Sequence, residues 1–524
     1  MDTVSTKRAS AGSQLIDLCR ELSSKRRLFL ASNRGPIEYR TDQNGNLRVQ
    51  RGSGGVVTAL NAVSQHIELT WFASALGEGD RRAVQNAQGE RLTLPLIGPQ
   101  TYLRFIVSPR NVYHKYYNIF CNPLLWFLQH YMWNSPYTPN IDAKVYDAWE
   151  NGYVKVNEAF ANTIIEESKN DPRPPIVFIQ DYHLYLVGKY LRQQMPEVTL
   201  LHFTHIPWPA HSYWLLLPPH MRKAIFEGLC ACDIVGLQTS NRDVPNFLHT
   251  CEALLQGAVV DFESNIVTIN NHITKVKAYP ISVDIAGLQK LSKSNWIQDY
   301  KKRLAPFLLK QNIVRVDRTE PSKNIVRGFK AFDLLLDRHP ELKGNVRFLA
   351  FLVPSRTRIK QYQRYNEEVL ELVSAINYKH GSTDWQPIKL FYENNYPQAI
   401  AAMCLYDVLL VNAVIDGMNL VAKEGPIVNE RNGVLVLSEA VGAHEQLKDG
   451  VLTITPVDTE NTAQMLYKAL SLSAEDRKRR SDILRRTIRR DDLDKWLCHQ
   501  LADVNQLLDQ QAAPKAAQLA LLHL

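Results

Sequence analysis

The chain has 524 residues, of which 45% are apolar and 22% are charged, and its formal net charge at pH 7 is +8. This composition is typical of globular proteins, and the length exceeds what one hydrophobic core supports, so we expect two to four domains. No stretch reaches the roughly 18 apolar residues of a membrane span, and the N-terminus lacks the apolar core of a signal peptide. We therefore expect a cytoplasmic protein with no membrane anchor and no membrane partner.

The positive charge does not by itself indicate nucleic acid. The densest basic segment, 477–490, alternates with Leu484 and Ile488 at helical spacing, so we interpret it as a solvated helix face. No aromatic and glycine pattern of an RNA-binding module accompanies it, and we expect no nucleic-acid partner. The seven cysteines are odd in number and scattered, which is typical of reduced thiols, and Cys230 and Cys232 lack the two-residue gap of a zinc site.

Short apolar runs alternate along the chain with longer segments of helical period, a pattern typical of parallel sheets covered by helices. In the first half the predicted strands are 28–32, 71–75, 176–180, 200–204 and 234–237. In the second half they are 313–316, 346–352, 388–392, 408–411, 434–437 and 451–454, with helices such as 325–335 and 362–378. The pattern predicts two Rossmann-like domains.

The predicted domain boundaries follow from these elements. We expect a flexible segment over 1–24, a first Rossmann-like domain over 25–283 and a second over 284–485. Charged and apolar residues then alternate at helical spacing, which predicts a helix over 486–512 that returns to the first domain, before a tail over 513–524.

Charged and polar residues follow the ends of several predicted strands. In open parallel sheets, ligands bind at the carboxyl ends of the strands, so these positions are candidates for a site. They are Arg34, Asp181, His205, Arg318, Arg356 and Asp416.

A strand-to-helix junction gives the most specific signal, with the sequence Asp416-Gly417-Met418-Asn419-Leu420-Val421-Ala422-Lys423-Glu424. Gly417 lets the backbone approach a ligand, and the following N–H groups form the positive end of a helix. Asp416 and Glu424 add acceptors for hydroxyls, so the segment indicates an anionic, hydroxyl-rich ligand such as a nucleotide sugar. The alternative is an ordinary turn with two surface acids.

Two further segments predict contacts with phosphate. The loop Gly52-Ser53-Gly54-Gly55 has Val57 where a dinucleotide fingerprint has its third glycine, so it indicates a diphosphate loop, or a plain turn, more than a nicotinamide site. Arg318 and Lys323 flank a proline-containing loop and could neutralise a diphosphate leaving group, with solvated surface cations as the alternative. Arg356 and Arg358 could hold a second phosphate.

Asp181 and His205 follow neighbouring predicted strands and could share one substrate. The alternative for each is a structural role. The aromatic segment that contains Tyr117 and Trp126 is by itself typical of a core.

Taken together, these motifs resemble the retaining glycosyltransferases of the trehalose-6-phosphate synthase family, from Leu28 to about Trp496. The matching segments are Ser32-Asn33-Arg34, Gly54-Gly55, Tyr116-Tyr117-Asn118 with Trp126, Asp181-Tyr182-His183-Leu184, His205-Ile206-Pro207, Val316-Asp317-Arg318 with Ser322-Lys323, and Asp416 to Glu424. The resemblance implies an α/β fold of the GT-B type, with two Rossmann-like domains whose parallel sheets face each other across a cleft. It implies no metal and no other cofactor.

The resemblance also implies a reaction and a role for each motif residue. The reaction is transfer of glucose from a nucleoside diphosphate glucose to glucose 6-phosphate with retention, which gives trehalose 6-phosphate. Acceptor-binding residues would be Arg34, Tyr117, Trp126, Asp181 and Arg356. Donor-binding residues would be Gly55, Arg318, Lys323, Gly417, Met418, Asn419, Leu420, Val421 and Glu424. Catalytic residues would be His205, Arg318, Lys323 and Asp416.

Some positions depart from the family pattern. The usual Leu-Asp-Tyr before the motif lysine is Thr319-Glu320-Pro321 here, and Ile415 stands where an arginine is common. This loop resembles a branch that includes a pseudo-glycosyltransferase. The alternatives are therefore a relative with another donor or acceptor, such as that enzyme or a glucosylglycerol-phosphate synthase, or a non-catalytic sugar-phosphate-binding regulator. The donor base stays open, and so does a homo-oligomer.

Overall fold

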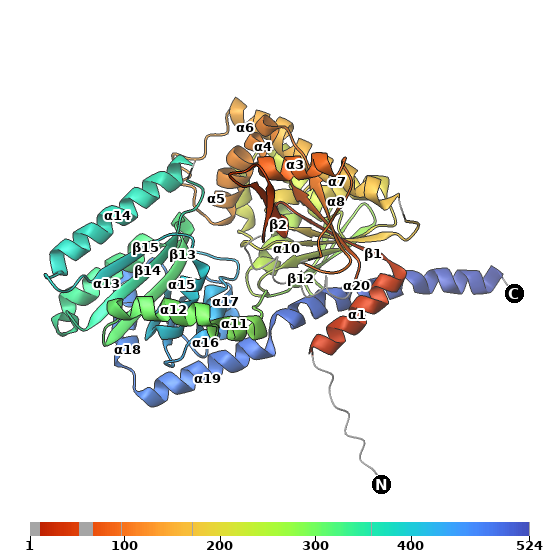
Figure 1. Cartoon of the computed structure of the whole chain (residues 1–524). Helices are drawn as coiled ribbons and strands as arrows, with labels where there is room; N and C mark the ends of the chain where they lie inside the picture. The colour runs from red at the N-terminus through yellow and green to blue at the C-terminus, as the bar shows by residue number, and fades with distance from the viewer. Residues whose placement is uncertain (1–10, 52–66, 96, 170, 358, 523–524) are drawn as a thin grey trace, which may run out of the picture. The chain divides into compact units, whose positions relative to one another are not determined.

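The computed structural model describes residues 11–51, 67–95, 97–169, 171–357 and 359–522. The chain forms two compact units, shown with element labels in Figure 1. Unit 1 contains residues 1–129, 133–279 and 493–524, and unit 2 contains residues 130–132 and 280–492. Unit 2 thus starts slightly before the expected position 284, and the helix that belongs to unit 1 starts at Leu493 instead of 486.

In the described part of unit 1, ten strands form one sheet in the order β10-β11-β12-β9-β8-β7-β1-β4-β6-β5. The seven neighbouring strands β12, β9, β8, β7, β1, β4 and β6 pair in parallel. Strands β11 and β10 extend one side of the sheet and β5 the other, all by antiparallel pairing. Their bounds are β1 Arg27–Ser32, β4 Leu69–Ser74, β5 Leu92–Thr93, β6 Thr101–Ile106, β7 Pro175–Gln180, β8 Thr199–Phe203, β9 Ile234–Leu237, β10 Val259–Asp261, β11 Ile266–Ile269 and β12 His272–Ala278. A separate hairpin joins β2 (Ile37–Thr41) and β3 (Leu47–Arg51).

The central strands of this sheet are buried along their whole length. β1, β4, β7, β8 and β9 contain only buried residues, which explains why their sequences are apolar runs without alternation. Counted in chain order, the parallel strands follow the order 3-2-1-4-5-6 of a Rossmann sheet, and β12 adds a seventh parallel strand beside β9. The order therefore reverses between β1 and β7.

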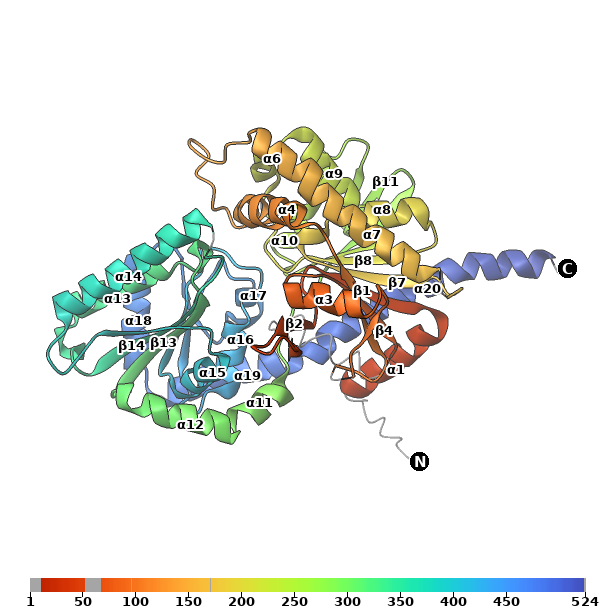
Figure 2. The ribbon, with the colours of Figure 1, turned by 45° about the horizontal axis from the view of Figure 1, so that its top comes forward.

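Helices cover both faces of this sheet (Figures 1 and 2). One group of helices contains α7 Lys155–Ser168, α8 Val187–Gln194, α9 Pro219–Leu229 and α10 Asp243–Leu254. On the other face, α1 (Ala11–Lys25) packs against α20 (Leu493–Leu522). Shorter helices are α3 Glu78–Asn86, α4 Arg110–His114, α5 Trp126–Gln129 and α6 Ala143–Ala148.

The N-terminal segment differs from the expectation of flexibility over 1–24. Residues 11–25 form α1, and Leu15, Cys19 and Leu22 on one face of this helix are buried. At the other end of the chain, α20 continues through the segment 513–522, where we expected a tail. The apolar residues of α1 recur at i, i+4 and i+7, which is the spacing of an amphipathic helix and was the signal for it.

The described part of unit 2 contains a six-stranded, fully parallel sheet in the order β15-β14-β13-β16-β17-β18. The strands are β13 Gln311–Arg318, β14 Val346–Val353, β15 Ile388–Tyr392, β16 Val408–Val411, β17 Val434–Ser438 and β18 Leu452–Ile454. In chain order this is again the Rossmann order 3-2-1-4-5-6. The reversal lies between β13 and β16, and the strands predicted for this half are confirmed.

Two groups of helices pack around the second sheet (Figure 2). The first group is α13 Ile325–Arg338, α14 Lys360–His380 and α18 Thr459–Ser471. The second is α11 Ile285–Ser292, α12 Asn295–Leu304, α15 Tyr396–Leu405, α16 Val421–Val428, α17 Ala443–Leu447 and α19 Ala474–Arg490. Phe329 and Phe332 of α13 pack edge-on against Phe348 of β14, at the centre of the core.

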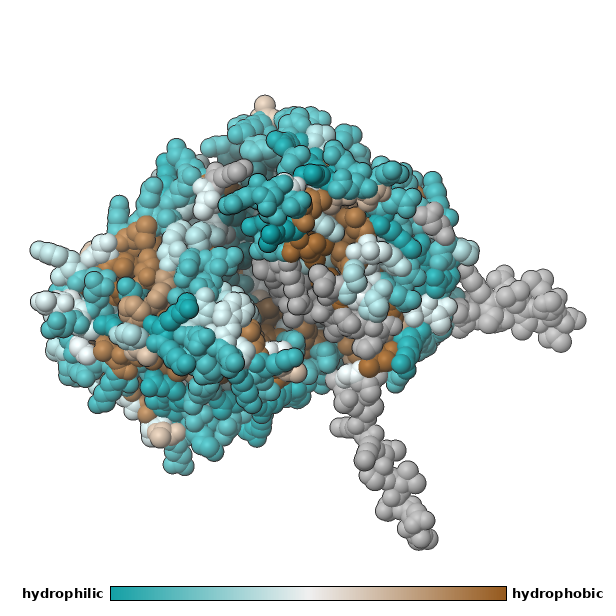
Figure 3. All heavy atoms as spheres, viewed as in Figure 1, coloured by the Kyte–Doolittle hydropathy of each residue, from teal (hydrophilic) through white to brown (hydrophobic). Residues whose placement is uncertain are grey.

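The basic segment of α19 is more than a solvated face. Arg477 pairs with Asp407 at 3.2 Å, Arg480 donates to the Val451 carbonyl at 2.9 Å, and Arg485 donates to the Asn429 carbonyl at 2.6 Å. These arginines attach α19 to the rest of unit 2. Among the described residues, no helix combines the length and apolar character needed to cross a membrane. The face in Figure 3 is mainly hydrophilic, with smaller hydrophobic patches between the hydrophilic residues.

Close packing of α8 against α9 generates a stability prediction. A Cβ on Gly228 would lie 2.1 Å from the Tyr185 carbonyl oxygen, so Gly228→Ala forces the two elements apart. We expect the substitution to lower the free energy of unfolding by about 1–3 kcal/mol, the usual cost of overpacking. The control is Gly12→Ala in α1, where the added Cβ meets no atom closer than 3.7 Å. Equal melting temperatures for both variants in calorimetry would contradict the packing argument.

Candidate functional site

The ends of β13 and β16 in unit 2 bring together the predicted cations and acids of the second domain. Arg318 is the last residue of β13, and Lys323 lies in the short turn Pro321–Lys323 that follows. Asp416 follows β16 and forms a single parallel bridge with Val441. Since the strand order reverses between β13 and β16, this is the edge where Rossmann sheets bind ligands.

Lys323 and Asp416 form the central ion pair of this edge. The Lys323 ammonium donates to Asp416 Oδ2, and Asn419 Nδ2 donates to the same oxygen at 3.0 Å. Burial alone raises the pKa of the Asp416 carboxyl, but the Lys323 ammonium and the Asn419 amide outweigh it, so the pKa lies below its ordinary value. Asp416 is therefore ionised at neutral pH and fixes the position of the lysine.

The segment from Gly417 to Val421 presents backbone N–H groups at the start of α16. Within the described residues, these five successive N–H groups donate no hydrogen bond, while the next ones donate to carbonyls of Asn419 and Leu420. Asn419 has a left-handed backbone with φ of 63°, which turns the segment into the helix. Consecutive N–H groups at a helix start favour an anion.

Glu424 lies in the first turn of α16, close to this row of N–H groups. It accepts a hydrogen bond from the Tyr396 hydroxyl at 3.2 Å. Burial raises the pKa of Glu424 to about 7, although the Tyr396 hydroxyl lowers it. Carboxylate oxygens at this position suit the hydroxyls of a ribose or a sugar.

Arg356 lies beside Arg318 in unit 2. It follows β14, and its Nη1 bonds Glu320 Oε1 and the Tyr362 hydroxyl, each at 2.8 Å. Arg318 pairs with the same Glu320 oxygen at 3.3 Å. The sequence treated the two arginines as separate phosphate contacts, and the tertiary structure joins them through one carboxylate.

In unit 1, the candidate residues lie at the other reversal of strand order. Arg34 follows β1 and Asp181 follows β7, and these two strands are neighbours in the sheet. Asp181 Oδ1 accepts the backbone N–H of His205 at 3.1 Å, which ties the ends of β7 and β8 together. His205 Nε2 contacts Gln180 Oε1 at 2.9 Å. Burial lowers the pKa of His205 to about 3, so the imidazole is neutral at pH 7.

The backbone of Asp181 is strained. Its φ of 72° and ψ of 170° lie in a region that residues other than glycine rarely adopt. Such a conformation costs on the order of 1–3 kcal/mol and is concentrated at functional sites. Its carboxylate is thereby fixed at the end of β7.

The aromatic segment forms a stack next to these residues. The Tyr117 ring lies parallel to Tyr113 at 5.6 Å between centroids and to His183 at 5.9 Å. Burial lowers the pKa of Arg34, but Tyr117, Glu38 and Tyr113 together outweigh burial and raise the pKa. Trp126 is only 6% exposed and packs against Tyr182. The structure thus places Arg34 beside Tyr117, and it places Trp126 in the core of unit 1.

Some predicted phosphate contacts lie outside the described residues, and the buried cation Lys423 was missed. Gly55 and the rest of the loop Gly52–Gly55 lie outside the described residues, as does Arg358.

Lys423 is fully buried in α16 and donates at 2.7 Å to both the Ile281 carbonyl and Gln446 Oε1. Its signal was a lysine among the small and apolar residues Ala422 and Gly425. Burial lowers the pKa of Lys423 to about 7, against a nearby Asp491 that raises it.

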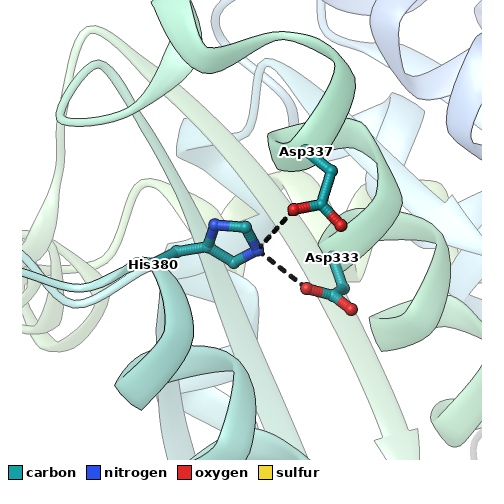
Figure 4. Close-up of side chains that lie close together, drawn as sticks. All are labelled: Asp333, Asp337 and His380. Atoms are coloured by element: carbon teal, nitrogen blue, oxygen red, sulfur yellow. Dashed lines mark hydrogen bonds and ion pairs between the residues drawn. The ribbon is translucent and has the colours of Figure 1, made fainter.

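Asp333, Asp337 and His380 come close enough together for metal binding (Figure 4). The two aspartates lie one turn apart on α13, and the imidazole of His380 points at both, with Nε2 2.7 Å from Asp333. Lys379 also binds Asp333 at 3.0 Å and Asp337 at 2.6 Å. Because Lys379 already forms ion pairs with both carboxylates, we interpret the cluster as an ion-paired link between α13 and α14.

Residues 26–506 match the model of glycosyltransferase family 20. The chain belongs to this family. It is therefore a retaining glycosyltransferase, and the resemblance drawn from the motifs is confirmed.

Relatives of known function resemble most of the chain. The UDP-forming α,α-trehalose-phosphate synthase A of Dictyostelium discoideum is 29% identical over 90% of this chain, which spans 61% of that protein. The UDP-forming enzyme of Pichia angusta is 31% identical, over 87% of this chain and 94% of its own length. Validamine 7-phosphate valienyltransferase of Streptomyces hygroscopicus is 28% identical over 94% and 96% of the two chains.

Solved structures show the same fold. The E. coli protein bound with UDP-2-fluoro glucose superposes with a TM-score of 0.77 at 25% identity, over 92% of this chain and 99% of that one. The Burkholderia xenovorans synthase in complex with glucose-6-phosphate superposes with a TM-score of 0.76 at 25% identity, over 91% of this chain and 100% of that one. The GT-B fold is thus confirmed. The expected cleft between facing sheets stays a prediction.

Lys423 generates a pH-dependent stability prediction. Its folded pKa of about 7 lies below the ordinary 10.5, so between these pH values the unfolded chain binds the extra proton. The Lys423 contribution to stability therefore rises with pH in this window, by at most about 1.4 kcal/mol per pH unit. In thermal melts at pH 7 and 9, the melting temperature of wild type minus that of Lys423→Met should increase with pH. A constant difference would contradict a depressed pKa.

Proposed function

We propose that this glycosyltransferase transfers glucose from UDP-glucose to glucose 6-phosphate and forms trehalose 6-phosphate with retention. The observation that carries the proposal is the edge of unit 2, where the Lys323–Asp416 pair, the N–H row 417–421 and Glu424 combine. An anion-binding row, a cation and two carboxylates match the diphosphate, the sugar and the ribose of a nucleotide sugar. The names of the relatives and the ligands of the two solved structures support the same substrates.

In the proposed donor site, Arg318, Lys323 and the N–H groups of Gly417, Met418, Asn419, Leu420 and Val421 hold the diphosphate. Charge grows on the diphosphate as the bond to the glucose carbon breaks, and fixed cations stabilise that charge most in the transition state. Asp416 orients Lys323 and accepts a sugar hydroxyl, while Glu424 accepts the ribose hydroxyls. Gly55 is proposed as a further diphosphate contact.

In the proposed acceptor site, Arg34 and Arg356 bind the phosphate of glucose 6-phosphate. Asp181, Tyr117 and Trp126 position the sugar ring. The acceptor hydroxyl attacks the glucose carbon on the side from which the diphosphate leaves, and its proton passes to the departing diphosphate. His205 contacts the donor sugar as a neutral hydrogen-bonding group, since its lowered pKa leaves the imidazole uncharged at pH 7 and unable to act as a general acid.

We propose that the reaction requires no metal and no other cofactor, because the two cations beside the N–H row take the electrostatic role. The proposed setting is the cytoplasm. The oligomeric state, including a homo-oligomer, is left to measurement.

A panel of donors and acceptors tests the function directly. The protein is incubated with UDP-, GDP- and ADP-glucose and with glucose 6-phosphate, glucose, glycerol 3-phosphate or a cyclitol amine phosphate, each with and without EDTA. Mass spectrometry should detect trehalose 6-phosphate and free UDP in both conditions. Exclusive use of a cyclitol amine phosphate would favour the activity of the Streptomyces relative, and loss of turnover in EDTA with recovery on Mg²⁺ would refute metal independence. Nucleotide binding without any product would identify a regulator.

The donor cations generate a kinetic prediction. Lys323→Ala and Arg318→Ala should each lower kcat by roughly 10²–10³-fold, the typical effect of losing one transition-state contact. The Michaelis constant for glucose 6-phosphate should change little in Lys323→Ala. The matched control is Lys302→Ala, which removes an exposed cation paired with Asp299 at 3.6 Å. Wild-type turnover in Lys323→Ala would remove this residue from the diphosphate site.

A further inference from the structure

Glu320 lies in the loop that departs from the family pattern, between β13 and α13. Its side chain is fully buried, with no exposed surface. Neither the resemblance nor the proposed roles assign it a task. A buried carboxylate in a polar loop is costly unless cations compensate its charge.

The compensation comes from three donors on one oxygen. Glu320 Oε1 accepts the Ser355 hydroxyl at 2.7 Å and Arg356 Nη1 at 2.8 Å, and it pairs with Arg318 Nη1 at 3.3 Å. Burial raises the pKa of Glu320, but Arg318, Arg356 and Lys323 outweigh it and bring the pKa to about 2. Glu320 therefore carries its charge throughout the neutral range.

The sheet brings the two arginines to this carboxylate. β13 pairs in parallel with β14, so that Arg318 lies opposite Val353, and the Thr319 N–H donates to the Val353 carbonyl at 2.8 Å. The loops that leave the two strands therefore start side by side. The first carries Glu320 and the second carries Ser355 and Arg356.

Arg356 depends on these contacts for its conformation. Its φ of 44° is left-handed, which is unfavourable for a residue other than glycine or asparagine. Its side chain is only 9% exposed, so its charge needs a local partner. Glu320 supplies that partner, while the Tyr362 hydroxyl accepts from the same Nη1 at 2.8 Å and the Tyr362 ring centroid lies 5.4 Å from the guanidinium carbon.

We propose that Glu320 is a positioning residue that holds Arg318 and Arg356 as one anion-binding pair, which deepens the proposed function and rests on it. Both guanidinium nitrogens lie within 3.3 Å of the same oxygen, so one carboxylate sets the direction of both side chains. A guanidinium has five N–H donors, and this contact engages one nitrogen of each. Arg318 then serves the donor diphosphate and Arg356 the acceptor phosphate.

Substitution of Glu320 tests this role. Glu320→Gln keeps the shape of the side chain and removes its charge, so Arg356 loses its main partner. With the substrate pair found in the panel, we expect the Michaelis constant for the phosphorylated acceptor to rise about tenfold and kcat to fall. Glu320→Asp keeps the charge and restores the residue that is usual in the family, so it should recover most of the lost affinity.

Two controls separate positioning from a merely structural effect. Glu460→Gln breaks an exposed pair with Arg338 and should leave both constants unchanged. In an Arg356→Gln background, adding Glu320→Gln should raise the acceptor constant no further, since the two residues act as one unit. The proposal would be overturned if Glu320→Gln raised the Michaelis constant for the acceptor equally in the wild-type and Arg356→Gln backgrounds. It would also be overturned if well-folded Glu320→Gln kept the wild-type Michaelis constant.

Failure of the proposed function is distinguishable from failure of this inference. The panel identifies the substrates before any variant is made, so a different acceptor would appear there. If Glu320→Gln does not fold, as judged by its melting temperature, Glu320→Asp decides the matter. A folded Glu320→Asp variant with a Michaelis constant for the acceptor as high as that of Arg356→Gln would also contradict the positioning role of Glu320.

Discussion

Parallel pairing of β13 with β14 and β16 is the constraint on which the charged edge of unit 2 depends. The backbone ladder fixes Arg318 opposite Val353, and the loops after β13, β14 and β16 therefore emerge together. A shift of register by one residue would turn each side chain to the other face of the sheet. The Lys323–Asp416 pair and the arginines around Glu320 exist because this register brings their loops together.

Charge balance and backbone strain accompany this arrangement. Asp416 is partly buried and Glu320 fully buried, and neighbouring cations hold the pKa of both carboxyls down, whereas the pKa of Lys423 is lowered because burial outweighs the effect of Asp491. Breaking a buried pair leaves an uncompensated charge, which typically costs 3–5 kcal/mol. Asp181 and Arg356 are both left-handed at strand ends, so part of the stability gained in the cores offsets strain at the sites.

Much of the fold was predictable because the central strands are buried on both faces and therefore read as uninterrupted apolar runs. Strands β7 and β16 are examples of such runs, with every residue buried. Strands β6 and β12 were missed, since their residues alternate between buried and partly exposed positions and include arginine or lysine. Their strand character depends on pairing with β4 and β9, which local sequence does not encode.

The sequence by itself determined the fold class, the family and the identity of the motif residues, because apolar periodicity and short motifs are local properties of the chain. Only the tertiary structure decided which of these residues share a partner. Arg318 and Arg356 are separated by a whole strand and helix in the chain, yet both reach one oxygen of Glu320. Lys423 is likewise a surface-type residue by sequence that becomes buried where α16 meets Ile281. Such partnerships arise from strand register and helix packing, which bring together residues that are distant in the chain.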